Sequence, residues 1–233
     1  MNYTIHIKRQ PDKTAEPFWQ DFNIAADGEL SIAAVLTILN ARAELTDTLG
    51  NKAEPIAWER SCQVKKCGAC AMRINGLPRL ACSTFLNALD GQTVTLEPLR
   101  KFPLVRDLIV DRSVVFDKMK QIQLWLESDA RMPDKTHETR YQSARCLMCG
   151  CCLEVCPNFD AGKDFTGAIS PVNVFRIFNE EQDASHRRDM AKAYRKRYFE
   201  GCGKSLSCYN ICPAEIPVEE LMVRSNAAAV WGR

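Results

Sequence analysis

The sequence lacks the features that mark membrane-spanning, secreted and nucleotide-binding chains. It has no run of about 18 apolar residues, and its first residues, MNYTIHIKRQPD, show neither the apolar region nor the cleavage site of a signal peptide. A glycine-rich motif such as G-x-G-x-x-G is missing. The formal net charge is only +2, so no charge excess points to nucleic acid. We expect a globular chain in a reducing, cytoplasmic setting, with no transmembrane segment or signal peptide and no nucleic-acid partner.

Histidine is also scarce, whereas cysteine is abundant: the 233 residues include 3 His and 12 Cys. Disulfides are rare in a reducing compartment, so this many cysteines indicates metal or redox chemistry. The cysteines form three groups along the chain: Cys62, Cys67, Cys70 and Cys82; Cys146, Cys149, Cys151, Cys152 and Cys156; and Cys202, Cys208 and Cys212.

The pattern of apolar residues predicts two domains, 1–103 and 104–233. In the first, alternation at the N-terminus and around 93–96 predicts strands, and Asn75-Gly76 is typical of a hairpin turn. A single helix is expected after Ser31, where apolar residues recur at helical spacing. The boundary is placed at the prolines and basic residues of 98–103.

Residues 104–233 have a helical pattern. Asp111 is the expected cap of a helix whose apolar stripe extends to Leu126. Ser170-Pro171 is expected to open a second helix, with Ser as the cap and Pro in the first position. Further helices are predicted over 183–199 and 217–230. The basic residues of 187–197 are interpreted as one solvated or subunit-contact face rather than a nucleic-acid site.

The first cysteine group has the spacing C-x4-C-x2-C-x11-C, which is the plant-type ferredoxin pattern for a 2Fe-2S cluster. A loop suits this chemistry because its backbone N–H groups can point at the ligand sulfurs. Structural zinc is the alternative, but it usually uses two C-x2-C pairs, and Cys62 and Cys82 stand alone. A Rieske centre needs two histidines, which this segment lacks.

The other two groups form one interleaved motif. Cys146, Cys149, Cys152 and Cys156 spell C-x2-C-x2-C-x3-C-P, in which the fourth cysteine serves the other cluster. The C-terminal group has the same form, except that Ser205 stands at the second cysteine position. Because the last cysteine of each run binds the cluster of the other run, four thiolates are assigned to a 4Fe-4S cluster, namely Cys146, Cys149, Cys152 and Cys212.

Only three thiolates remain for the third site, Cys156, Cys202 and Cys208, which favours a 3Fe-4S cluster with Ser205 at the vacant corner. A 4Fe-4S cluster with a serine or water ligand is the alternative, although an alkoxide is a much harder ligand than a thiolate. Cys151 is left over and is interpreted as a small buried residue beside the cluster.

This order of clusters resembles the iron-sulfur subunit of succinate dehydrogenase and fumarate reductase over nearly the whole chain. The strings that carry the resemblance are Ser61-Cys62, Cys67-Gly-Ala-Cys70-Ala-Met, Leu80-Ala-Cys82, Cys146-Leu-Met-Cys-Gly-Cys-Cys152, Cys156-Pro157 and Cys212-Pro213. It implies a β-grasp plant-type ferredoxin domain followed by an all-α bacterial-ferredoxin-like domain, in an α+β chain. It also implies electron transfer between a FAD-containing flavoprotein subunit and a quinone site in a membrane anchor subunit, at the cytoplasmic side of the membrane.

The quinone end departs from the family pattern. Members that reduce ubiquinone typically have a Trp pair after Cys-Pro and a His after the first cysteine of the 3Fe-4S run. Here Asp160-Ala161 and Gly203 stand there. Pro157, Phe159 and Ser205 are kept as candidate quinone-side residues, with packing around the cluster as the alternative.

These departures favour menaquinone or another electron partner. A soluble fumarate reductase fed by a non-quinone donor is a second hypothesis, and a non-redox zinc or scaffold protein is a third. The direction of electron flow does not follow from the residues. Dicarboxylate chemistry is assigned to a partner subunit, because this chain has no motif for it.

Overall fold

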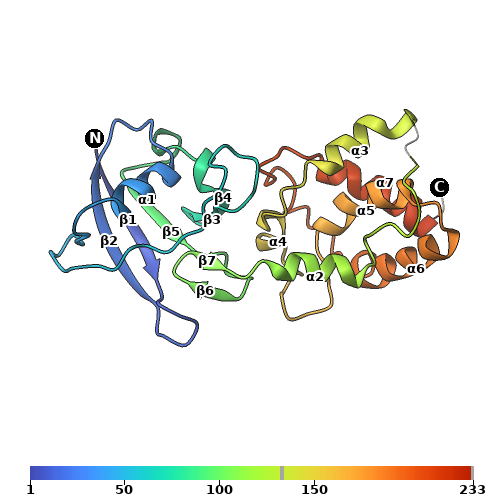
Figure 1. Cartoon of the computed structure of the whole chain (residues 1–233), viewed down its shortest axis with the longest axis horizontal. Coiled ribbons are helices and arrows are strands. Elements are labelled where there is room, and N and C mark those ends of the chain that lie inside the picture. Colours follow the sequence, from blue (N-terminus) through green and yellow to red (C-terminus); the bar gives the residue numbers. More distant parts are fainter. Residues whose placement is uncertain (132–133, 232–233) are drawn as a thin grey trace. The chain divides into compact units, whose positions relative to one another are not determined.

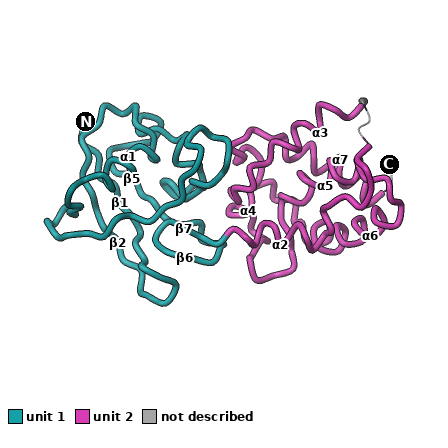
Figure 2. Tube along the Cα trace, viewed as in Figure 1, with its two compact units in different colours: residues 1–111 teal, residues 112–233 magenta. Residues whose placement is uncertain are grey.

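The computed structural model describes residues 1–131 and 134–231, which form two compact units, Met1–Asp111 and Arg112–Arg233 (Figures 1 and 2). The first unit is built on a mixed β-sheet and the second is helical, so the α+β class predicted from the sequence is confirmed. The first unit continues beyond the predicted boundary at residue 103. It includes a short hairpin of β6 (Leu104–Arg106) and β7 (Ile109–Val110).

The sheet of the first unit has five strands in the order β2-β1-β5-β3-β4. β1 pairs antiparallel with β2 and parallel with β5, while β3 pairs antiparallel with both β4 and β5. Alternate side chains of β1 are buried, which confirms the strand predicted at the N-terminus. The strands are β1 (Asn2–Arg9), β2 (Phe18–Ala25), β3 (Ala71–Ile74), β4 (Leu77–Leu80) and β5 (Thr93–Glu97).

Two elements of the first unit, a hairpin turn and a helix start, form where the sequence predicted them. Asn75 and Gly76 join β3 to β4 with φ values of 48° and 79°, the left-handed geometry of a tight hairpin turn. α1 (Ile32–Asn40) begins after Ser31, whose hydroxyl accepts a hydrogen bond from the Ala34 amide at 3.2 Å. α1 contacts the 3₁₀ turn Ala81–Ser83, and a second 3₁₀ turn spans Leu86–Ala88.

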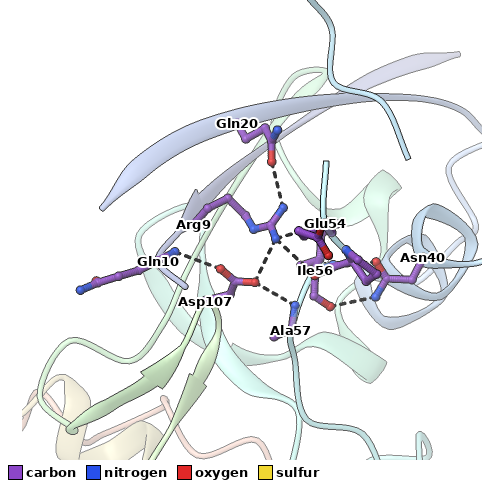
Figure 3. A network of polar contacts seen from close by, with 9 residues as sticks. Arg9, Gln10, Gln20, Asn40, Glu54, Ile56, Ala57 and Asp107 are labelled. Atoms are coloured by element: carbon purple, nitrogen blue, oxygen red, sulfur yellow. Dashed lines mark hydrogen bonds and ion pairs between the residues drawn. The ribbon is translucent and has the colours of Figure 1, made fainter. Parts of the chain in front are cut away.

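A buried polar network holds the β6–β7 hairpin in the first unit (Figure 3). Arg9 Nη2 lies 3.1 Å from Asp107 Oδ2, and both side chains are almost fully buried. Asp107 also accepts hydrogen bonds from the backbone amides of Gln10, at 2.9 Å, and Ala57, at 3.0 Å. The network therefore fixes the backbone that leads from Ala57 into the cysteine loop beginning at Cys62.

The second unit is arranged around α5, whose residues are buried on nearly every side. One side of α5 packs with α6 and α7, and another packs where cysteines of the second and third groups gather. The helices are α2 (Ser113–Gln121), α3 (His137–Ala144), α4 (Cys151–Glu154), α5 (Ile169–Glu180), α6 (Ala184–Tyr194) and α7 (Val218–Trp231). A 3₁₀ turn spans Asp134–Thr136 and a π-helical turn spans Arg195–Phe199.

Two predicted helix starts are wrong. Arg112, not Asp111, occupies the N-cap position of α2, because the Asp111 amide is bonded to the Pro103 carbonyl at 2.8 Å and stays with the hairpin. α5 begins at Ile169, so Ser170 and Pro171 lie within its first turn, where the missing proline amide is not needed.

The end of α2 also differs from the prediction. Gln123, with φ of 57°, follows the helix and leaves Leu126 outside it. Within residues 1–131 and 134–231, none of the helices is both long enough and apolar enough to span a bilayer.

Candidate functional site

The first cysteine group lies in one place because of the β3–β4 hairpin. The hairpin register pairs Ala71 with Leu80, which places Cys70, just before β3, beside Cys82, just after β4. The Cys82 amide points at the Cys70 sulfur at 3.5 Å. Hydrogen bonding links Cys62 to Cys67, so all four thiols belong to one continuous region of loop and hairpin.

Backbone amides of the loop point at these sulfurs. Val64 N and Lys66 N donate to Cys62 Sγ at 3.4 and 3.3 Å, and Lys65 N donates to Cys82 Sγ at 3.4 Å. Positive φ values at Gln63, Lys65 and Gly68, of 52°, 59° and 75°, turn the chain so that its amides face inward. The loop therefore forms the amide-lined cradle that an anionic iron-sulfur group requires.

The four thiols differ in exposure and in acidity. The amides of Val64 and Lys66 lower the pKa of Cys62 to about 7, whereas burial raises the pKa of Cys70 to about 12. Cys67 is exposed and Cys82 is buried. One side of this group therefore faces solvent.

The second predicted set lines a single cavity in the second unit, named the second cavity after this thiol set. Cys212, from the C-terminal run, lines this cavity together with the three cysteines of the earlier run. The remaining wall is almost entirely apolar. The lining residues are Cys146, Cys149, Cys152 and Cys212 with Leu147, Met148, Gly150, Ile169, Val172, Pro213, Ala214, Ile216 and Val218.

Two side chains outside this cavity act on Cys149. The Cys151 thiol, which is fully buried, hydrogen-bonds to Cys149, and this bond is the main cause that lowers the pKa of Cys149 to about 7. The positive charge of Arg112 contributes in the same direction. By contrast, burial raises the pKa of Cys146, Cys152 and Cys212. Sequence reasoning found Cys151 but not its hydrogen bond, and it did not find Arg112.

The third predicted set lines a separate cavity of the same unit, named the third cavity after this thiol set. Ser205 lies at this cavity with the three thiols, at the place where the motif lacks a cysteine. The lining residues are Cys156, Cys202 and Cys208 with Asn158, Phe165, Ala168, Tyr198, Gly203, Lys204, Ser205, Leu206 and Met222. Tyr198 was missed by the sequence reasoning, since no motif spacing singles it out.

The three candidate quinone-side residues lie in different environments. Pro157 and Ser205 are exposed. Phe159 is 2% exposed and is not among the residues that line the third cavity. Its ring lies close to Gly167, where a Cβ would meet Phe159 Cδ2 at 3.3 Å, and faces the Lys118 amine. Phe159 therefore packs inside the second unit, against Gly167 and Lys118, and not at the third cavity.

The donor sets fit iron-sulfur groups. In the part of the chain that the structure describes, no three His, Cys, Asp or Glu side chains converge as the ligands of a single metal ion would. In the second unit the thiols instead surround cavities with apolar walls, and thiolates are the ligands that such clusters use. Each cavity contains one predicted thiol set and no cysteine of the other.

Comparisons with known proteins agree with this arrangement. A family described as a 2Fe-2S iron-sulfur cluster binding domain matches residues 4–117, and a 4Fe-4S dicluster domain matches residues 142–216. The chain therefore carries these two cluster-binding domains in this order.

Related proteins match nearly the full chain. The succinate dehydrogenase iron-sulfur subunit of Bacillus subtilis is 33% identical over 230 residues, covering 94% of this chain and 89% of that protein. The fumarate reductase iron-sulfur subunit of Wolinella succinogenes is 26% identical over 237 residues, covering 93% and 92%. A chain of the Mycobacterium smegmatis Sdh1 complex in the apo form has the same fold, with a TM-score of 0.79, 23% identity and coverage of 100% of this chain and 97% of that chain.

Because identity of a third extends over almost the entire chain, and because the two cluster-binding domains occur in the predicted order, this protein belongs to the family of iron-sulfur electron-transfer subunits of succinate dehydrogenase and fumarate reductase.

Proposed function

We propose that this chain relays electrons through three clusters between a FAD-containing subunit that acts on succinate or fumarate and a quinone site in a membrane anchor. Iron-sulfur clusters exchange single electrons at potentials from about −700 to +450 mV, which suits such a relay. Cys62, Cys67, Cys70 and Cys82 hold a 2Fe-2S cluster. Cys146, Cys149, Cys152 and Cys212 hold a 4Fe-4S cluster, and Cys156, Cys202 and Cys208 hold a 3Fe-4S cluster.

The observation that carries this proposal is the separation of the second and third thiol sets into two cavities, one with four cysteines and one with three. Ser205 lies at the three-thiol cavity, and this position supports its assignment to the vacant corner of a 3Fe-4S cluster. A β-grasp fold for the first unit and a bacterial-ferredoxin-like fold for the second agree with the sheet order and the interleaved motif.

The two ends of the relay have different surfaces. Lys65 and Lys66 are exposed on the first cysteine loop, where they suit an acidic face of the flavoprotein subunit. Leu206 lines the third cavity and Tyr209 follows Cys208 in the chain; they are 46% and 50% exposed and suit an apolar anchor subunit. With Pro157 and Ser205 exposed nearby in the motif, this end is the proposed quinone side. The chain then associates peripherally with the cytoplasmic side of the membrane.

The chain's own residues hold the clusters and shield them. Loop amides stabilise negative charge on Cys62 and Cys82, and the apolar walls of the second cavity exclude water. Dicarboxylate chemistry belongs to the flavoprotein partner in this proposal.

The proposal is tested by low-temperature EPR on the anaerobically purified protein, as isolated and after dithionite, with iron and labile sulfide assayed on the same sample. We expect an oxidised 3Fe-4S signal, reduced 2Fe-2S and 4Fe-4S signals, and about nine irons and ten sulfides per chain. Ten irons without the 3Fe-4S signal would instead establish a four-iron third cluster. Zinc without labile sulfide would overturn the relay.

The electron partner is tested on the intact complex, purified in mild detergent. Co-purification with a hydrophobic quinone-binding subunit is the expected result, and the bound quinone, extracted and identified, distinguishes menaquinone from ubiquinone. An intact, active complex without such a subunit would establish the soluble fumarate reductase with a non-quinone donor.

A further inference from the structure

Tyr198 is the aromatic residue of the third cavity with a hydroxyl group. It lies four residues before Cys202, is 2% exposed, and lines the cavity together with Cys156, Cys202 and Cys208. It belongs to the π-helical turn Arg195–Phe199, which continues α6. π-helical turns are rare and frequently occur at functional sites, so Tyr198 is a candidate for a role at the third cavity.

Tyr198 and Cys202 line the same cavity and pack in the same apolar cluster, and the Tyr198 hydroxyl hydrogen-bonds to the Cys202 sulfur. A phenol has an ordinary pKa of about 10, so Tyr198 carries its proton at neutral pH. Since a bound thiolate has no proton to give, the tyrosine O–H is the donor and the Cys202 sulfur is the acceptor.

The ring of Tyr198 is held on both sides. Phe165 stacks on it, with centroids 5.9 Å apart and planes 16° apart, and Tyr194 lies against it at 5.1 Å and 36°. Gly201 allows this packing, because a Cβ there would lie 2.7 Å from Phe165 Cδ2. Tyr198 is thus preorganised toward the sulfur of Cys202.

A hydrogen bond to a cluster ligand changes the reduction potential of the cluster. Reduction adds negative charge, which spreads onto the ligand sulfurs, so a donor to sulfur stabilises the reduced form more than the oxidised form. The effect is larger in a buried site because the surroundings screen the interaction less than water does.

We propose that Tyr198, through its hydrogen bond to the Cys202 sulfur, raises the reduction potential of the third cluster and so favours electron arrival at the proposed quinone end. Tyr198 is a positioning residue that acts through Cys202. The inference rests on the proposed function, since it requires a cluster held by Cys156, Cys202 and Cys208.

The test is a redox titration of the third cluster, followed by its oxidised EPR signal in the intact complex. Tyr198→Phe keeps the ring and removes the donor. Tyr194→Phe is the matched control, because it removes a buried hydroxyl from the same aromatic stack whose partner is Asn226 rather than sulfur. The potentials of the other two clusters are measured in the same samples.

For Tyr198→Phe we expect the reduction equilibrium of the third cluster to shift about tenfold toward the oxidised form, or about 59 mV lower for a one-electron couple. Iron content and the other two potentials stay unchanged, and Tyr194→Phe leaves all three potentials in place. An intact third-cluster signal with an unchanged potential in Tyr198→Phe would overturn the inference while leaving the relay standing. Absence of that signal from the unsubstituted complex would overturn the proposed function, and the inference with it.

If Tyr198→Phe loses its third cluster, a second variant tests the hydrogen bond from Tyr198. Site-specific incorporation of 3-fluorotyrosine at position 198 makes the hydroxyl a stronger donor without removing it. The potential of the third cluster then rises. A potential that stays constant or falls on fluorination contradicts the role of Tyr198.

Discussion

The cysteine loop of the first unit and the cavities of the second unit provide for clusters in two different ways. In the loop, backbone amides of Val64, Lys65 and Lys66 contact the sulfurs, and one side is open to solvent. In the cavities, backbone amides also reach the sulfurs, as those of Ala214, Glu215 and Ile216 do at Cys212. Side chains are added there, namely the Cys151 thiol at Cys149 and the Tyr198 hydroxyl at Cys202. The environment of the first site therefore depends on backbone conformation, and that of the other two depends in addition on the identity of neighbouring side chains.

This difference predicts how each site responds to substitution. Amide donors persist whatever side chain is present, so the first site is sensitive to changes that move its backbone. The cavities keep their backbone when one side chain changes, but they lose a ligand or a donor at once. Two predictions test this contrast, and a third concerns the stability of the second unit away from its cavities.

The largest effect is expected at Cys149, which we propose as a 4Fe-4S ligand on the basis of the interleaved spacing. Cys149→Ser replaces a soft thiolate with a harder ligand, so most of the four irons of this cluster should be lost. Because a cluster bound only by the folded chain stabilises that fold, the second unit should also unfold at a lower temperature. Iron analysis and differential scanning calorimetry measure both effects.

Cys151→Ser is the matched control. Cys151 is fully buried but does not line the cavity, and serine retains a donor toward Cys149. We expect full iron content and a loss of about 1–3 kcal/mol from placing a hydroxyl in a site shaped for sulfur. Equal iron loss in both variants would show that Cys151 is itself a ligand.

The next effect is expected at Asp107, which tests the dependence of the first site on its backbone. Asp107→Asn leaves Arg9 buried beside a neutral partner, where breaking a buried pair costs about 3–5 kcal/mol. Urea unfolding of the first unit, followed by 2Fe-2S absorbance, should show that loss, because Asp107 also holds the amide of Ala57 ahead of the loop.

Glu44→Gln provides the contrast for this experiment. Glu44 forms an exposed ion pair with Lys52 at 2.6 Å, in the same unit. Exposed pairs contribute about 0–1 kcal/mol, so the urea midpoint should barely move. A comparable loss in both variants would argue against the buried network as the support of the loop.

A smaller, pH-dependent effect is expected at Glu181 in the second unit. Burial opposes its charge, but hydrogen bonds from the Ser128 hydroxyl and from the amides of Asp183, Glu127 and Gln182 outweigh burial and lower the pKa of Glu181 to about 2. The carboxylate thereby joins the segment before residue 132 to the start of α6.

The sign of the pH dependence follows from this lowered pKa. Glu181 stabilises the fold above its ordinary pKa of 4.5, and this contribution is lost as the pH falls from about 4.5 to about 2. Glu181→Gln should cost about 2 kcal/mol at pH 7 and progressively less below pH 4.5. Chemical unfolding of both proteins between pH 2 and 7 measures the difference, and a difference that is constant with pH would contradict the lowered pKa.

Local signals in the sequence were sufficient for several elements. The Asn75-Gly76 turn, the Ser31 cap and the start of α7 after Pro217 are each decided by a few neighbouring residues. Other elements depend on distant partners and were not predicted. α3 has little apolar periodicity, and it is held by the Ser143 bond to the Val172 carbonyl and by the Arg140–Glu180 pair.

β2 and the β6–β7 hairpin were missed for a similar reason. β2 begins with the exposed Phe18 and Trp19, which blur its alternation. The hairpin is joined to its unit by Asp107, whose partners Gln10 and Ala57 lie 97 and 50 residues away in the chain. Prediction from neighbouring residues compares positions only a few places apart, so it does not detect contacts between residues this far apart in the chain.

By itself the sequence predicted the class of chemistry, and its spacings group the cysteines of the second unit as the two cavities do, since iron-sulfur ligands follow residue type and short, regular spacings. The tertiary structure alone decided which groups surround those cysteines: the amides at Cys62, Arg112 and Cys151 at Cys149, and Tyr198 at Cys202. The physical reason is that a hydrogen bond or charge contact depends on orientation and burial. Packing of remote segments, such as Phe165 against the π-helical turn, sets both of these.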